Sequence, residues 1–194
     1  MADSSTGGYL LPGDTPAAPA TDLALDGIFQ QLVVNLTGLP GNMVRPRWQP
    51  TPPQEPGLTE DWAAVGVTQI TPEGYSPSIT HSSSADTLNR HERIEVTASF
   101  YGPDGQSNAS IVRDGICIPQ NMEALNALAI GLIDASVIRS VPELVNQRYR
   151  RRYDLTLTFR RQIVRVYPIL DIASSESIIT SDTPPYTETV LVHD

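Results

Sequence analysis

The sequence contains no lysine, and all 13 of its basic residues are arginine. The absence of lysine excludes Schiff-base chemistry, a phosphate-binding loop that ends in Gly-Lys-Ser/Thr, and a protein-kinase site, because each of these needs a lysine amine. Cysteine is almost as scarce, since Cys117 stands alone. A single cysteine excludes a disulfide framework or a cysteine-based zinc site within one chain. Its place after an apolar helical pattern predicts a buried small hydrophobic residue.

Long hydrophobic runs are also missing. The longest, from Ala124 to Ile133, contains Asn126 and is much shorter than the roughly 20 residues that cross a bilayer, so we expect no membrane partner. The N-terminus lacks the basic region and apolar core of a secretory signal, which favours a protein made and used inside a cell. With 194 residues, 40% of them hydrophobic, the chain suits one water-soluble domain.

The charge balance is acidic, with a net charge of -9. Because phosphate neutralisation dominates affinity for DNA, an acidic chain is a poor general DNA binder. DNA could still pass close to it without specific binding.

Proline and glycine divide the chain into three parts, which we expect to be an extended N-terminal arm (residues 1–21), a folded domain (22–172) and an extended C-terminal arm (173–194). A helical apolar pattern begins after Asp22, a plausible N-cap, and ends before Gly38, a plausible stop. Residues 46–58 hold five prolines and predict a fixed, extended connection. Ordering an arm costs conformational entropy, which contacts with another chain can offset. We therefore expect partner chains to hold the N-terminal and the C-terminal arm.

Several strand patterns follow the first helix. Residues 62–70 predict a strand buried on much of both faces, and residues 71–89 a hairpin-like excursion or a long loop. The clearest strand is 92–101, where apolar and polar residues alternate. Two helices, at 107–116 and after Pro119, precede strands at 130–139 and 147–167; the alternation in the last strand shifts at Arg160 and Arg161, which suggests a bulge. The order predicts an α+β fold, an antiparallel sheet covered on one face by helices.

No residue set predicts catalysis. His91 and Glu92 begin like a zinc-protease motif, but Glu95 stands where the second histidine should be. His81 and His193 lie in other segments, and no Gly-x-Ser-x-Gly elbow completes a triad. We therefore expect no catalytic, metal or cofactor site.

An arginine stripe is the strongest physical feature. Strand geometry sends Arg148, Arg150 and Arg152 to one face, and Arg160 and Arg161 follow on the same strand. Three interpretations compete: a solvated face, ion pairing between subunits, and nucleic-acid contact, which the acidic total disfavours. We take these five arginines as candidate subunit-interface residues, and we expect Arg150 and Arg152 to be exposed charges that contribute little to the stability of the single chain.

Seven motifs occur in a fixed order: RPRWQP at 45–50, DWAAVGV at 61–67, RHE at 90–92, SFYGP at 99–103, RDG at 113–115, VPELV at 141–145 and RRQIVRVYPIL at 160–170. Together, over about residues 20–172, they resemble the neck terminator or tail terminator proteins of contractile-tailed phages. The motif residues that we expect to be structural are Arg45, Arg47, Trp48, Trp62, Arg90, His91, Glu92, Tyr101, Gly102, Pro142 and Glu143. We expect Trp48 to pin the proline-rich connection against the sheet edge and Trp62 to begin a buried strand.

The resemblance implies a structural protein of the virion tail and neck, assembled in the host cytoplasm. Such proteins form a homo-oligomeric ring, a hexamer, on the head-proximal end of the tail tube. The ring stops tube and sheath polymerisation and joins the tail to the head-tail connector or stopper. The tail tube and connector proteins would be partners, with the sheath protein a further candidate, and DNA would pass through the lumen without specific binding. The fold of the family is similar to the α+β fold expected above.

Two alternatives stay open. A connector-completion protein of the same neck, an adaptor or a stopper, would use similar physics with another ring size, commonly twelve for an adaptor. A small hydrolase would need a convergent cluster of histidine, carboxylate and nucleophile that the sequence does not suggest. Ring symmetry separates the first alternative from a terminator.

Overall fold

The computed structural model describes residues 8–74, 76–145, 147–169, 174–180 and 187–193. The chain divides into two compact units, one formed by residues 1–18, 77–89 and 164–194 and the other by residues 19–76 and 90–163. The second unit holds the helices and most of the buried core. The match of these units to the three expected segments is not tested, and those boundaries stay a prediction.

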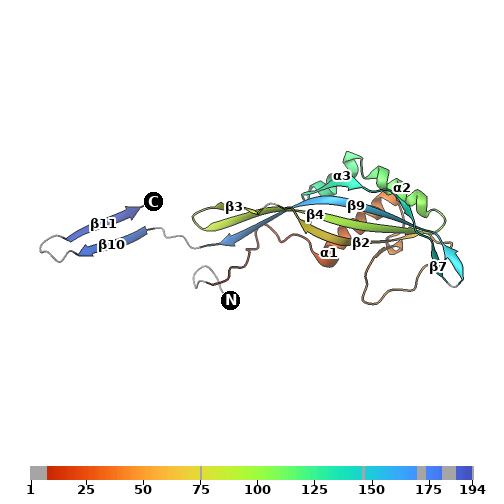
Figure 1. Cartoon of the computed structure of the whole chain (residues 1–194), viewed down its shortest axis with the longest axis horizontal. Coiled ribbons are helices and arrows are strands. Elements are labelled where there is room, and N and C mark those ends of the chain that lie inside the picture. Colours follow the sequence, from red (N-terminus) through yellow and green to blue (C-terminus); the bar gives the residue numbers. More distant parts are fainter. Residues whose placement is uncertain (1–7, 75, 146, 170–173, 181–186, 194) are drawn as a thin grey trace. The chain divides into compact units, whose positions relative to one another are not determined.

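The main sheet is mixed but mostly antiparallel, as Figure 1 shows. Its strand order is β1 (Val44–Pro46), β2 (Trp62–Pro72), β4 (Ala85–Tyr101), β9 (Arg152–Pro168) and β5 (Ile130–Ala135). Two short strands extend it: β3 (Ser78–His81) pairs with β4, and β6 (Arg139–Ser140) pairs with β9. Strand β1 is parallel to β2 and lies at one end of the order.

Two smaller sheets each contain two antiparallel strands. One joins β7 (Glu143–Val145) to β8 (Arg148–Arg150), and the other joins β10 (Ser174–Thr180) to β11 (Thr187–His193). The pairing of β3 with β4 confirms the hairpin-like alternative for residues 71–89.

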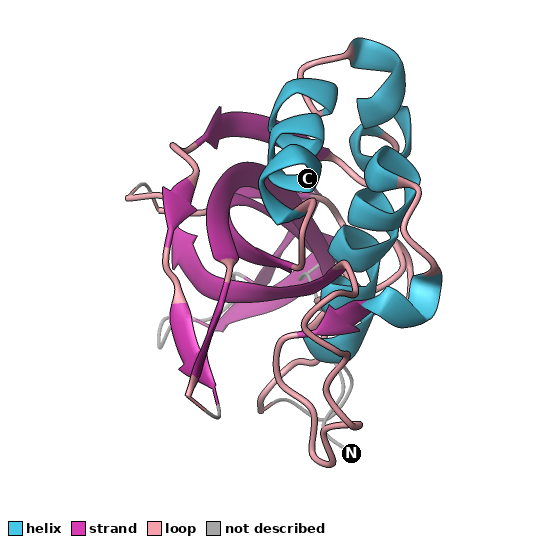
Figure 2. Cartoon of the chain, turned by 90° about the vertical axis from the view of Figure 1, so that its right-hand side faces the viewer, coloured by secondary structure: helices cyan, strands magenta, loops and turns pink. Residues whose placement is uncertain are grey.

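The helices are α1 (Asp22–Thr37), α2 (Gly105–Gly115) and α3 (Pro119–Asn126), with a short 3₁₀ turn at Gly41–Met43. They gather on one side of the strands (Figure 2), and α1 packs on β1, β2 and α2. The buried face of α1 consists of Leu25, Phe29, Leu32 and Val33. The expected α+β class is therefore confirmed.

Helix ends follow the sequence signals closely. Gly38 has φ +72° and donates its N–H to the carbonyl of Val34, which confirms the predicted stop. Pro119 opens α3 as predicted. The predicted N-cap was wrong by one residue, since Thr21 is the cap and Asp22 is the first helical residue. Cys117 is exposed, contrary to expectation, because it follows α2 in the turn before α3 rather than on the buried helix face.

The strand patterns hold where one face is buried. Ile94, Val96, Ala98 and Phe100 are buried along β4. On β2 only the first half is buried, so the expected burial on both faces does not extend to its end. The phase change expected at Arg160 and Arg161 does not occur on the buried face. There the odd-numbered set continues without a break and consists of Leu155, Leu157, Phe159, Arg161 and Ile163.

A register irregularity lies instead in β5. Its pairing with β9 is regular at both arginines and shifts between Leu132 and Asp134. The bend that we expected beside the arginines therefore falls on the neighbouring strand.

Candidate interaction site

An aromatic stack forms where β2 begins and β4 ends. Trp62 and Tyr101 face each other in the strand register, and their rings stack with centroids 4.1 Å apart and an interplanar angle of 8°. Arg45 lies over the Trp62 ring, with its Cζ 5.7 Å from the centroid. Arg150 lies over Tyr101, with its Cζ 4.6 Å from that centroid. Two guanidinium groups thus use the electron-rich faces of two buried rings.

Carboxylates pair with the arginines on the Tyr101 side of this stack. Glu143 accepts hydrogen bonds from Nη2 of Arg150 and Nη1 of Arg152, both at 2.5 Å. Arg150 also lies 2.6 Å from Oε1 of Glu55, and Arg152 donates from Nε to Oδ1 of Asp154 at 2.7 Å. The side chain of Arg150 is only 8% exposed. Each cation therefore has carboxylate partners inside its own chain.

The pKa values of the network reflect this competition between burial and pairing. Burial raises the pKa of Glu143, but the hydrogen bonds from Arg150 and Arg152 outweigh it and hold the pKa of that carboxyl below its ordinary value. Burial raises the pKa of the Tyr101 hydroxyl, against the opposing effect of Arg152. At neutral pH Glu143 is therefore ionised and Tyr101 is neutral.

The same contacts hold the β7–β8 hairpin. Glu143 and Arg150 are opposite each other in its register, and Leu144 is opposite Tyr149. Leu144 is 64% exposed and Tyr149 is 77% exposed. Figure 1 shows β7 at the end of the sheet where β4 leads into α2. The ion pairs fix the base of the hairpin while its two large apolar side chains stay in solvent.

A pocket of about 450 Å³ lies next to the stack. It is lined by residues of the first motif and of the proline-rich connection, together with the stack: Arg45, Pro46, Arg47, Trp48, Gln49, Pro52, Pro53, Glu55, Trp62, Ala64 and Tyr101. Trp48, 56% exposed, lies over Gly66 of β2. A Cβ at Gly66 would lie 2.9 Å from Cβ of Arg47, so glycine allows this close approach.

A second, buried ion pair joins β9 to β4. Nε of Arg161 donates to Oε1 of Glu92 at 2.9 Å, and its Nη2 contacts the same oxygen. Nη1 of Arg161 donates to the carbonyl of Ala20 at 2.5 Å, and Arg90 lies 3.3 Å from Oε2 of Glu92. Because Glu92 and the carbonyl of Ala20 pair with its guanidinium group, Arg161 can occupy a position on the buried face of β9.

Arg160 makes an exposed ion pair with the residue that follows β2. Its Nε and Nη2 donate to the two carboxylate oxygens of Glu73, at 2.5 and 2.8 Å. This hydrogen bonding lowers the pKa of Glu73.

The structure separates the five candidate interface arginines. Arg150, Arg152, Arg160 and Arg161 all pair with carboxylates of their own chain, whereas Arg148 is exposed. The expectation that Arg150 and Arg152 are exposed charges with little effect on stability was wrong for Arg150, which is buried, as is Arg161. The interface role of the five residues is not tested and stays a prediction. Sequence reasoning missed the partners Glu55, Glu73 and Asp154.

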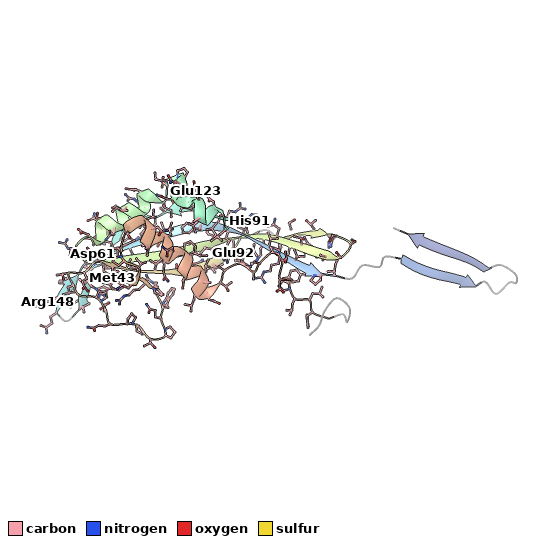
Figure 3. The ribbon with its side chains drawn as sticks, turned by 180° about the vertical axis from the view of Figure 1, so that it is seen from behind. Met43, Asp61, His91, Glu92, Glu123 and Arg148 are labelled. Atoms are coloured by element: carbon pink, nitrogen blue, oxygen red, sulfur yellow. The ribbon has the colours of Figure 1, made fainter. Side chains whose placement is uncertain are left out.

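Several expected structural residues shape this region. Gly102 has φ +100°, and a Cβ there would lie 2.4 Å from Oδ1 of Asp61, which caps the N–H of Asp104. The carbonyl of His91 accepts a hydrogen bond from the N–H of Glu73. Pro142 precedes Glu143 at the start of β7. Figure 3 shows Asp61 and Arg148 toward one end of their unit, with His91 and Glu92 farther along the strands.

The groups that could suggest other functions are dispersed. Glu92 of the zinc-protease-like dipeptide is held by Arg161, and the exposed His81 contacts Asp86 at 2.6 Å. Within the described ranges no three His, Cys, Asp or Glu side chains gather as a metal site. The described helices include none that is long and apolar enough to span a membrane.

Comparison with known proteins identifies one family. The family model described as phage neck terminator protein matches residues 23–183, which is most of the chain. The match continues past Ala173, into the segment for which the motifs gave no resemblance. No curated protein matches the chain.

Proposed function

The chain belongs to the phage neck terminator protein family, and on that premise we propose that six copies close into a ring on the head-proximal end of the tail tube. The ring stops the growth of tube and sheath and joins the tail to the connector or stopper. A phage neck protein belongs to the tail and neck of the virion. Its role there is structural, and we assign it no catalytic step and no cofactor.

The observation that supports this proposal is the cluster of aromatic, arginine and exposed apolar side chains around the stack, the pocket and the β7–β8 hairpin. Protein interfaces are enriched in tryptophan, tyrosine and arginine, and these residue types line the stack, the pocket and the hairpin. The ion pairs of Glu143 hold the exposed Leu144 and Tyr149 in place before any partner arrives. A preformed surface loses little conformational entropy on docking, which suits a cap that must bind a tube end and stay bound.

Ring closure explains how such a surface can end polymerisation. A heterologous contact repeats around a ring and closes when its rotation divides a full turn. One face of the ring then copies the docking surface of the tube, and the other offers no further tube site. Growth stops because the next tube subunit has nothing to bind.

The charge pattern supports passage of DNA without specific binding. The chain carries a net charge of -9, and carboxylates of the same chain pair with Arg150, Arg152, Arg160 and Arg161. An excess of negative charge repels phosphates, so a lumen lined by this protein favours sliding of the genome.

Production of phage without this protein tests the proposal. Tails should then grow beyond their normal length and remain unjoined to heads, as seen by electron microscopy. Supplying the protein in trans should restore length and joining together. Tails of normal length, joined to heads, in the absence of the protein would contradict the proposal.

A further inference from the structure

We propose that the pocket formed by Arg45, Arg47 and Trp48 receives the acidic β10–β11 strand pair of a second copy of this chain. This inference rests on the proposed ring and names the contact that would close each seam.

The charges of the chain are segregated along the sequence. All 13 arginines lie between Arg45 and Arg165, and the same stretch holds 13 aspartates and glutamates, so it is neutral as a whole. Four carboxylate residues precede Arg45 and five follow Arg165, with no arginine or lysine among them. The entire net charge of -9 therefore lies in the two end segments, and the C-terminal one is the more acidic for its length.

The pocket offers cations that lack an acidic partner in the described part of the chain. Arg45 donates from Nε to the carbonyl of Asn42 and from Nη1 to the carbonyl of Gln54. Arg47 donates from Nη1 to the hydroxyl of Ser99 at 2.8 Å. Neither contact neutralises charge, and the one carboxylate at the pocket, Glu55, already pairs with Arg150. An incoming carboxylate would find two guanidinium groups with donors to spare.

The pocket also offers an apolar anchor and a strand edge. The exposed indole of Trp48 rests on Gly66, and Pro52 and Pro53 line the same hollow. Strand β1, which carries Arg45, is the terminal strand of the main sheet order and is only three residues long. Aromatic anchors beside an open strand edge are the features by which proteins capture extended or strand-like segments.

The β10–β11 strand pair has matching properties. It forms a two-stranded sheet of its own, and an isolated hairpin of two strands is marginally stable in water, so it needs a surface to rest on. Its sequence combines two glutamates, Glu176 and Glu188, with five large aliphatic residues: Ile178, Ile179, Val190, Leu191 and Val192. Acidic and apolar groups are what the arginines and the indole would bind. In a ring with heterologous contacts each copy supplies one pocket and one strand pair per seam.

Photo-crosslinking in the assembled protein tests this contact. A photoreactive phenylalanine analogue replaces Trp48 in the full chain, which is mixed with an equal amount of isotopically heavy chain and added to tails assembled without the protein. We expect crosslinks that join light to heavy peptides and map to residues 174–193. A probe at Ile118, equally exposed on the turn before α3, is the control and should not reach that segment. Crosslinks confined to one chain, or directed to residues 1–21 or to another neck protein, would overturn the inference.

A charge swap gives a second, independent readout. One full-length variant carries Arg45→Glu and Arg47→Glu, and the other carries Glu176→Arg and Glu188→Arg. Each alone should lower ring formation roughly tenfold or more, because like charges then meet at every seam. An equal mixture should restore it, since an even-numbered ring can alternate the two variants and pair opposite charges at each seam. The second variant changes neither the stack nor the pocket, so its loss of assembly cannot be due to damage there.

Failure of this inference and failure of the ring proposal are distinguishable. Wild-type rings with no effect of either variant would overturn the pocket contact and leave the terminator ring intact. Absence of any ring on wild-type tails would overturn the proposed function itself.

Discussion

Glu143 and Arg150 face each other across the β7–β8 hairpin, with Oε2 of the glutamate 2.5 Å from Nη2 of the arginine. This single contact has three structural effects. It closes the hairpin, places the buried guanidinium over Tyr101, and leaves Leu144 and Tyr149 exposed on a fixed support. The VPELV motif, weak as a sequence signal, thus supplies the glutamate that holds the β7–β8 hairpin.

Neutralising Glu143 should loosen the hairpin. We expect Glu143→Gln to lower the free energy of unfolding by about 1–3 kcal/mol, because two charge-assisted hydrogen bonds are weakened while Arg150 keeps Glu55. Urea denaturation measures the change, and Glu123→Gln, at an exposed position of α3, is the matched control. Equal effects of the two variants would show that the Glu143 contacts do not stabilise the fold.

Acid should remove the contribution of ionised Glu143 to the free energy of unfolding. The pKa of Glu143 is lower in the folded protein than its ordinary value of 4.5, so its stabilising effect is complete above that value and is lost as the pH falls through the lowered folded pKa. The difference in unfolding free energy between the wild type and Glu143→Gln should therefore shrink from pH 7 to pH 3. A difference that stays constant over this range would contradict the assignment.

The buried pair of Arg161 and Glu92 should be costly to break. Glu92→Gln should reduce stability by about 3–5 kcal/mol, because it leaves a buried guanidinium without its counter-charge. The double variant Arg161→Met with Glu92→Leu should lose much less stability than the summed losses of the single variants Arg161→Met and Glu92→Leu. A thermodynamic double-mutant cycle measures the coupling, and additive losses would contradict a direct pair.

The two tryptophans should behave differently on truncation. Trp62 is 8% exposed and stacked on Tyr101, so Trp62→Ala should cost about 3–5 kcal/mol. Trp48 keeps more than half of its surface in solvent, and Trp48→Ala should cost about 1 kcal/mol or less. Melting temperatures compare them directly. A similar loss for both would show that Trp48 is a core residue and not a docking anchor.

Polar replacement of the hairpin's apolar pair should separate folding from assembly. The double variant Leu144→Ser and Tyr149→Ser should change the free energy of unfolding by no more than about 0.5 kcal/mol per site, because both side chains are exposed. It should still fail to terminate tails, which would grow too long or remain headless. Normal tails from this variant would remove the hairpin from the docking surface.

Local sequence patterns predicted much of the fold. Alternation over 92–101, Pro119 and Gly38 each predicted an element or an end that the structure contains, because each signal acts within a few residues. The site was less predictable, since Arg161 meets Glu92 and Arg160 meets Glu73 only after the strands have paired. One signal was available: Arg161 keeps the odd-numbered phase of Phe159 and Ile163, which indicates a buried arginine and hence a buried partner.

The most direct test of the central proposal is an averaged electron-microscope image of the neck complex, viewed along the tail axis, with this protein located by a bound antibody fragment. We expect a sixfold ring at the head-proximal end of the tube, with density from each copy reaching the next. A twelvefold ring at that position, or copies that make no contact with one another, would contradict the terminator assignment.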